Sequence, residues 1–368
     1  MSYLPEPPYR HGATPKTGVV LVNLGTPEAA TPAAVRAYLK EFLSDPRVVE
    51  IPRLAWWLIL NGVILNVRPK QSAKKYARIW TAAGSPLRVH TDRQAKLLRD
   101  LLGEQLGSPF EVAWAMRYGT PSIAAALAGL KVAGCDKILV LPLYPQYAAS
   151  TTGATYDAVA RYLTRVRNVP SVRLVRDFHD HPAYIAALAA SVREYWAEHG
   201  KPERLVMSFH GLPQYTLERG DPYHCECHVT ARLLAEALGL KTEEWQLTFQ
   251  SRFGRTQWLQ PYTSVTLSQL ARQGKQRVDV VCPGFVSDCL ETLEEIGIEA
   301  REAFLTAGGR ELHLIPCLNE RPDWIQALAA LACSHLGDWV SKDWDARLQA
   351  TKAQASAQRA TAMGGASQ

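Results

Sequence analysis

Short apolar segments alternate with amphipathic segments along most of the chain. Each half contains four apolar segments, at residues 18–24, 110–118, 136–144 and 172–178 and at residues 204–210, 244–250, 277–283 and 311–318. Continuous apolar strands that alternate with helices are typical of parallel sheets covered on both faces. We therefore predict an α/β fold with two similar Rossmann-like lobes, each a four-stranded parallel sheet flanked by helices.

The length agrees with two lobes, because 368 residues exceed what one hydrophobic core usually serves. We expect a flexible lead-in at 1–17, an N-terminal lobe at 18–181, a C-terminal lobe at 182–320, a C-terminal helix at 321–345 and a disordered tail at 346–368. Helical patterns occupy 182–199, 228–239, 263–273 and 288–303. Thr31 before Pro32 and Thr120 before Pro121 each predict the start of a helix in the first half.

Composition excludes several classes of protein. The net charge of +6 comes from dispersed lysines and arginines, which argues against a nucleic-acid partner and suits an anionic small molecule or membrane surface. Neither the glycine-rich dinucleotide motif nor the phosphate-binding loop of nucleotide hydrolases occurs. Seven cysteines without an export signal fit a reducing cytosol. The longest apolar run, 54–67, is short for a membrane span.

His210 stands where an apolar strand ends, directly before the chain-breaking residues 211–213. In parallel sheets, ligands bind at the carboxyl ends of strands, so a cleft is expected at this point. A histidine at this position has two interpretations: it either bonds a backbone carbonyl as a structural group or faces the ligand.

The segment 285–304 carries a second candidate feature. Ser287 is the expected N-cap of a helix on which Asp288, Glu291, Glu295 and Glu299 share one face. The alternatives are a solvated acidic face and a ladder of carboxylates that passes cations or protons into the cleft. A histidine facing one carboxylate suits either proton transfer or a first-row metal ion, and with so few ligands the metal would pass through rather than stay.

Two further segments are unusual. The string from His224 to His228, "HCECH", resembles a metal-binding sequence but lacks the spacing of zinc ribbons, so the alternative is an ordinary helix start. The segment 54–80 joins an apolar, aromatic run to a basic one. It is either a core helix or an exposed flap that grips a flat apolar ligand or rests on a membrane.

Five motifs in this order resemble those of the ferrochelatase family: "LVNLGTP", "LPLYPQYAASTTGAT", "SFHGLP", "FQSRFGRTQWLQPYT" and "CPGFVSDCLETLEEIGIE". The likeness covers about residues 15–335 and is closest to bacterial members that use protoporphyrin. It implies two Rossmann-like lobes around a porphyrin cleft and insertion of Fe²⁺ into protoporphyrin IX to form protohaem with loss of two protons.

The resemblance also implies roles for individual residues. His210 matches the family's active-site histidine and Glu291 its facing carboxylate, and both are the expected contacts of the metal. Asp288, Glu295 and Glu299 match the acidic helix face. The expected porphyrin contacts are Leu24, Arg68, Tyr76, Ser85, Tyr144, Trp258 and Phe285.

Some features depart from the family. Cys289 stands where many relatives have histidine, and Ala149 and the absence of cysteine after Cys333 argue against an iron–sulfur cluster. We therefore expect no resident cofactor, with Fe²⁺ as substrate, and a cytoplasmic protein able to contact an anionic inner membrane face. Two rivals remain: a chelatase for another metal or tetrapyrrole, and a non-catalytic haem or porphyrin carrier.

Overall fold

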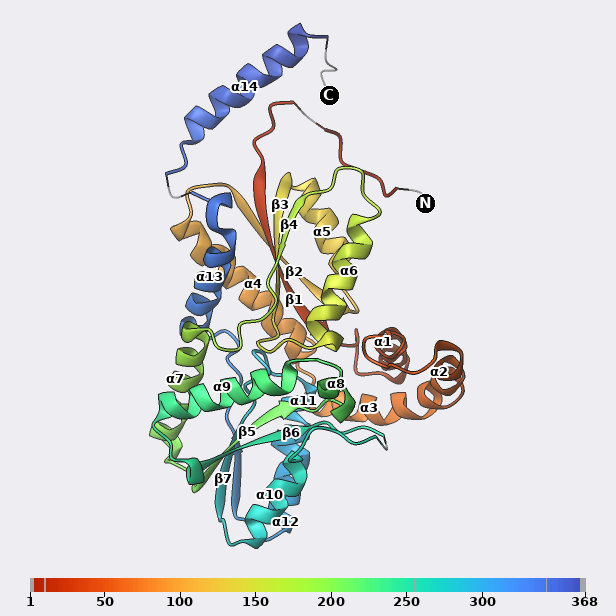
Figure 1. Cartoon of the computed structure of the whole chain (residues 1–368), viewed down its shortest axis with the longest axis vertical. Coiled ribbons are helices and arrows are strands. Elements are labelled where there is room, and N and C mark those ends of the chain that lie inside the picture. The colour runs from red at the N-terminus through yellow and green to blue at the C-terminus, as the bar shows by residue number, and fades with distance from the viewer. Residues whose placement is uncertain (1–2, 10, 255, 342, 365–368) are drawn as a thin grey trace.

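The computed structural model describes all residues except 1–2, 10, 255, 342 and 365–368. Two four-stranded parallel sheets, one in each lobe, confirm the predicted fold class (Figure 1). The first sheet has the order β2-β1-β3-β4, and the second repeats it as β6-β5-β7-β8. The strands are β1 (Lys16–Gly25), β2 (Phe110–Tyr118), β3 (Cys135–Pro142), β4 (Ser171–Leu174), β5 (Arg204–His210), β6 (Trp245–Gln250), β7 (Arg277–Val281) and β8 (Glu311–Leu314).

Each sheet places its most apolar strand in the interior. β1 pairs in parallel with both β2 and β3, so Val20 lies beside Ala113 on one side and Val140 on the other. A strand with neighbours on both edges and helices on both faces has no solvated side, which explains its unbroken apolar run. The strands β4 and β8 end at Leu174 and Leu314, earlier than predicted, where their pairing with β3 and β7 stops.

Helices of the first lobe begin mostly as the sequence indicates. They are α1 (Pro32–Leu43), α4 (Pro86–Gln105), α5 (Ile123–Val132) and α6 (Ala154–Leu163), with the π-helix η2 (Ala149–Gly153) leading into α6. The Thr31 hydroxyl accepts from the Ala34 N–H and caps α1, as predicted. The predicted cap at Thr120 is wrong: Ser122 caps α5 by accepting from the Ala125 N–H, because Thr120 instead bonds Glu28.

The helices in the second half of the chain include several short or irregular ones. They are α7 (Pro182–His199), α8 (Gln214–Glu218), α9 (Tyr223–Leu238), α10 (Thr263–Arg272), α11 (Leu290–Leu293), the π-helix η4 (Glu295–Ala300), α12 (Arg301–Thr306) and α13 (Pro322–Leu336), with 3₁₀ turns at Thr242–Glu244 and Gly337–Trp339. α13 returns to pack against α4 and α7. One apolar core therefore joins the lobes, with Leu21 and Leu98 of the first in the same cluster as Phe209 and Trp324.

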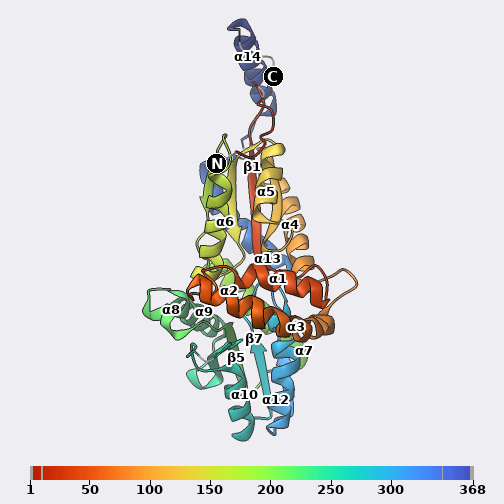
Figure 2. The same ribbon diagram turned by 90° about the vertical axis from the view of Figure 1, so that its right-hand side faces the viewer.

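A helical arm of residues 53–79 lies across the junction of the lobes. It comprises α2 (Arg53–Ile59), the π-helix η1 (Leu60–Ile64) and α3 (Leu65–Ile79), and Figure 2 brings it to the front together with α1. Leu54 is 76% exposed and Trp57 60% exposed, so this part of the arm is not a core helix. Within the described residues, no helix is long and apolar enough to cross a membrane.

Both chain ends differ from expectation. The lead-in is anchored at Glu6, which pairs with Lys131 and accepts the Arg167 N–H. The expected disordered tail is instead the helix α14 (Ala346–Ala362) over most of its length, capped by Asp345 and projecting from the first lobe (Figure 1). Its alanine-rich composition has high helix propensity, although none of its residues is buried. Residues 365–368 lie outside the described residues.

Candidate active site at the ends of β5 and β6

His210 is the last residue of β5 and is held from both sides. Its Nδ1 lies 2.7 Å from the carbonyl oxygen of Gly211. Because a carbonyl can only accept, Nδ1 carries the proton, and the neutral ring therefore presents an unprotonated Nε2. Tyr223 donates its hydroxyl proton to the His210 carbonyl at 2.9 Å. The backbone bond expected of a structural histidine is thus present, yet it also orients the ring for chemistry at Nε2.

Gly211 is required beside this histidine. A Cβ at position 211 would lie 2.7 Å from the carbonyl oxygen of Gln250 and 3.2 Å from the Trp258 ring. Only glycine permits the chain to leave β5 between β6 and Trp258. Trp258 is itself half-buried, and its backbone bridges Pro213. The predicted porphyrin contact Trp258 therefore lies next to the end of β5.

Glu295 lies near His210, and the Glu291 carboxylate lies near Glu295. The Gln250 side chain, at the end of β6, donates to the backbone carbonyl of Glu291 at 2.7 Å. Glu295 accepts from the Ser251 N–H at 2.6 Å and from the Ser251 hydroxyl at 2.5 Å. Burial raises the pKa of Glu295 and the charge of Glu291 raises it further, whereas Ser251 and the nearby His210 lower it. His210, Glu291 and Glu295 thus form one electrostatic group, hereafter the His210 cluster.

Asp288 is buried and hydrogen-bonded to neighbouring loops. Asp288 is buried before the helix begins, because Cys289 rather than the predicted Ser287 is the N-cap of α11. Its carboxylate accepts from Asn319 Nδ2 at 2.7 Å and from the Thr292 hydroxyl at 2.9 Å. These bonds tie the β7–α11 loop to the loop after β8, so Asp288 has a structural role here.

The outer end of the acidic face is paired with the helical arm. Lys75 lies 2.6 Å from Glu299 and 3.3 Å from Glu294, and Arg78 lies 3.0 Å from Glu294. Glu294 is buried, and sequence reasoning missed it. The available signal was the basic run beginning at residue 68, which supplies cations at helical spacing opposite this acidic helix. The outer end of the face is therefore paired with cations of the arm, whereas Glu295 interacts with His210 and Glu291.

The structure brings some of the predicted porphyrin contacts toward the His210 cluster. The Phe285 ring lies 6.5 Å from the His210 ring. Tyr76 of α3 is buried near Glu291, and its pKa is raised first by burial and then by that carboxylate. The Arg68 guanidinium lies 4.2 Å from the centre of the Phe253 ring and connects α3 to the loop after β6.

The other predicted contacts lie in the first lobe. Leu24 is at the carboxyl end of β1. Ser85 is buried and accepts the Thr26 hydroxyl at 2.7 Å. Tyr144 is buried after β3, where burial raises the pKa of its hydroxyl and an interaction with Thr155 lowers it. These three residues follow or cap elements of the first sheet, and none is in described contact with the His210 cluster.

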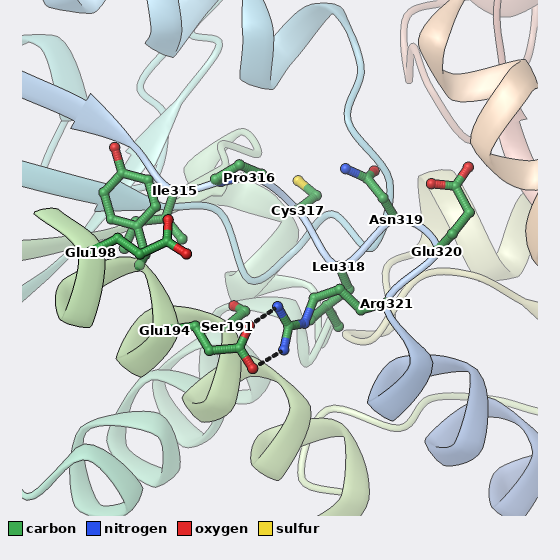
Figure 3. A pocket seen from close by; sticks show the side chains of 11 residues that line it. Ser191, Glu194, Glu198, Ile315, Pro316, Cys317, Leu318, Asn319, Glu320 and Arg321 are labelled. Atoms are coloured by element: carbon green, nitrogen blue, oxygen red, sulfur yellow. Dashed lines mark hydrogen bonds and ion pairs between the residues drawn. The ribbon is translucent and has the colours of Figure 1, made fainter.

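A second feature is a pocket between α7 and the β8–α13 loop. It is lined from α7 by Ser191, Glu194, Tyr195 and Glu198 and from the loop by residues 315–321. Figure 3 shows Arg321 forming a two-pronged ion pair with Glu194 across its floor, with distances of 2.6 and 3.0 Å. None of the predicted site residues lines it, so it is distinct from the His210 cluster.

Comparison with known proteins decides the family. The family model described as ferrochelatase matches residues 16–336. The chain belongs to the ferrochelatase family. It is 65% identical to the ferrochelatase of Aromatoleum aromaticum over 338 residues, which cover 92% of this chain and 93% of that one. It is also 58% identical to the ferrochelatase of Nitrosomonas europaea over 361 residues, or 98% of each chain.

Solved structures agree at the level of the fold. Bacillus subtilis SirB, whose structure contains Fe³⁺, superposes with a TM-score of 0.53 at 14% identity, over 90% of this chain and all of that one. As a ferrochelatase, the chain is an enzyme that inserts metal into a porphyrin. Membership in this family argues against both rivals considered from the sequence, the non-catalytic carrier and the chelatase for another metal.

Proposed function

We propose that this ferrochelatase inserts Fe²⁺ into protoporphyrin IX at the His210 cluster, forming protohaem and releasing two protons. The observation that carries the proposal is an imidazole with an unprotonated Nε2 near Glu295, a carboxylate whose pKa is raised and which also interacts with Glu291. A group that accepts protons and groups that attract a cation are both needed, since two pyrrole protons leave as one dication enters.

The enzyme has to make the four nitrogen lone pairs accessible. They point into the plane of a flat macrocycle, so a metal cannot reach all of them from one face until the ring bends. Distortion of this kind is supported by binding contacts away from the reacting atoms. In our proposal Trp258, Phe285 and Tyr76 contact the ring, and Arg68 binds a carboxylate at its edge.

We assign the proton step to His210 and the cation step to the carboxylates. His210 Nε2 accepts a pyrrole proton, for which a neutral imidazole is well matched near neutral pH. Glu291 attracts the incoming Fe²⁺. Glu295 interacts electrostatically with His210 and Glu291. It accepts the proton that His210 passes on, because the raised pKa of Glu295 is closer to that of an imidazole.

We also propose a weak peripheral contact with anionic membranes through the arm. The side chains of Leu54, Trp57, Leu58 and Val63 are all more than half exposed, and the cations Lys70 and Lys74 follow. Exposed apolar groups backed by cations favour an anionic lipid surface. A poorly soluble substrate and product make such a contact useful.

The last parts of the proposal concern groups that the enzyme does without. We propose no resident iron–sulfur cluster, since Cys227, Cys282, Cys289 and Cys317 are buried and burial raises the pKa of each thiol, which disfavours the thiolates that a cluster requires. The dispersed positive charge supports no nucleic-acid partner.

Fluorescence of zinc porphyrin, with Zn²⁺ in place of Fe²⁺, tests the proposal. His210→Ala is expected to lower turnover by roughly 10²–10⁴-fold, the usual contribution of a general base, while porphyrin still binds. His199→Ala is the matched control, because His199 Nδ1 also bonds a backbone carbonyl, that of Tyr195 at 3.0 Å, on an exposed helix end. Equal turnover in the two variants would refute the assignment.

A further inference from the structure

Two histidines on α9 stand outside the His210 cluster. His224 and His228 are one helical turn apart, and their ring centroids are 4.5 Å from each other. His224 is partly buried and its ring stacks on Phe249 at 5.7 Å, whereas His228 is exposed. Packing thus fixes one ring, and helical spacing brings the second alongside it.

The ring nitrogens of this pair are not used by the fold. Among the described residues, neither histidine has a hydrogen-bond or ion-pair partner, and their nitrogens are not enclosed. This contrasts with His199 and His210, each of which bonds a backbone carbonyl through Nδ1. Partial burial lowers the pKa of both His224 and His228, and the neighbouring His224 lowers that of His228 further, which favours neutral rings with lone pairs available.

From this geometry, we propose that His224 and His228 form a second metal site, which binds a divalent first-row transition-metal ion between their imidazoles. Two histidines at positions i and i+4 of a helix are a known chelating arrangement for zinc. Imidazole ligands select Fe²⁺, Zn²⁺, Cu²⁺ or Ni²⁺ over Mg²⁺ and Ca²⁺, which prefer oxygen. With two protein ligands, water completes the coordination and the ion exchanges readily.

Neighbouring residues indicate binding rather than catalysis. Glu226, between the two histidines in sequence, lies on the other side of the helix, where it accepts the Tyr147 N–H at 2.6 Å and pairs with Arg176 at 3.2 Å. It is therefore not available to activate a metal-bound water. Cys225 is exposed, yet no described group of three such ligands includes it.

The proposed α9 site is a neighbour of the His210 cluster but shares no ligand with it. Tyr223, the residue before His224, bonds the His210 carbonyl, and Phe249 precedes Gln250. The inference does not depend on the roles assigned to His210, because it needs only the free imidazoles on α9. Its test therefore has to count metal ions rather than measure porphyrin metallation.

Isothermal titration of the porphyrin-free protein with Zn²⁺ provides that count. The wild type and His210→Ala are both expected to show the α9 site. In His224→Asn and His228→Asn, each of which keeps a planar polar group, Zn²⁺ affinity at that site should fall by at least roughly 10–100-fold, the loss known for altering only an outer partner of a ligand. His199→Asn should bind as the wild type does.

A second measurement guards against loss of binding through misfolding. The Cu²⁺-loaded wild type should give an electron paramagnetic resonance spectrum with nitrogen couplings from two imidazoles, and each single variant should lose one while its melting temperature is unchanged. Either of two results overturns the proposal: unchanged zinc stoichiometry and affinity in the double variant, or a copper spectrum that is the same with and without His224 and His228.

Discussion

Ser251 donates both its backbone N–H and its hydroxyl to the carboxylate of Glu295, at 2.6 and 2.5 Å. Ser251 follows the last residue of β6 and has φ of 63°, a conformation that side-chain-bearing residues rarely adopt. A strained residue that holds a carboxylate beside His210 indicates that the position of this carboxylate matters for the reaction.

Removing the hydroxyl of Ser251 should change the pH dependence of turnover. Ser251→Ala deletes a donor to the charged form of Glu295, so the pKa of Glu295 rises further and the acidic limb of the pH–rate profile moves to higher pH. A hydrogen bond to a charged group is worth about 1.5–3 kcal/mol, so turnover should fall roughly tenfold or more. Ser251→Gly separates the causes, because it removes the hydroxyl and also the strain. If neither variant shifts the limb, Ser251 does not position Glu295.

Glu295 should make the fold less stable as pH rises. Its pKa is raised in the folded protein, so the folded state binds this proton more tightly than the unfolded state does. The resulting stability is complete below the unfolded pKa, near 4.5, and is lost as pH rises through the folded pKa. Glu295→Gln cannot ionise and should gain on the wild type across that window, by about 1.4 kcal/mol for each pH unit that separates the folded pKa from the unfolded one. Urea unfolding at a series of pH values measures this difference, and parallel curves for the two proteins would contradict the expectation.

Substitution of Asp288 should lower stability, whereas substitution of the nearby Glu291 should lower turnover. Asp288→Ala removes the acceptor of Asn319 Nδ2 and one of the two acceptors of the Thr292 hydroxyl, and an unsatisfied buried group costs about 1–3 kcal/mol. Glu291→Gln should keep the melting temperature and lose turnover, since the bond from Gln250 reaches its backbone rather than its side chain. Melting curves and zinc-porphyrin assays on both variants check this. A catalytically dead but fully stable Asp288→Ala protein would restore Asp288 to the reaction.

Substitutions of the two adjacent tryptophans of the arm should have different effects. Trp57 is 60% exposed, whereas the Trp56 ring is partly buried and donates its Nε1–H to the Leu43 carbonyl at 2.6 Å. Trp57→Ser should weaken binding to anionic vesicles with little change in melting, and Trp56→Ser should lower the melting temperature. Co-sedimentation at low and high salt measures the first effect, which screening by salt should diminish. Unchanged vesicle binding by Trp57→Ser would rule out this membrane contact.

Much of this fold follows from local patterns. The apolar runs predict all eight strands, and the signal is clearest for the central strands β1 and β5, whose burial on both faces leaves no polar alternation. The position of His210 is predictable for the same reason, since a strand end is a local feature. The ends of β4 and β8 and the cap of α5 were misplaced, because they depend on edge pairing and on competition from distant side chains.

The sequence by itself determined the two parallel sheets, the family and the place of His210 at the end of a strand. Only the tertiary structure decided which carboxylates remain there. The regular spacing of Asp288, Glu291, Glu295 and Glu299 assumes one continuous α-helix, whereas the segment is a short α-helix that begins at Leu290 and passes into a π-helix. Asn319 binds Asp288, the arm binds Glu299, and Ser251 binds Glu295. These partners lie far away in sequence, and a carboxylate takes its role from the donors that the fold brings to it.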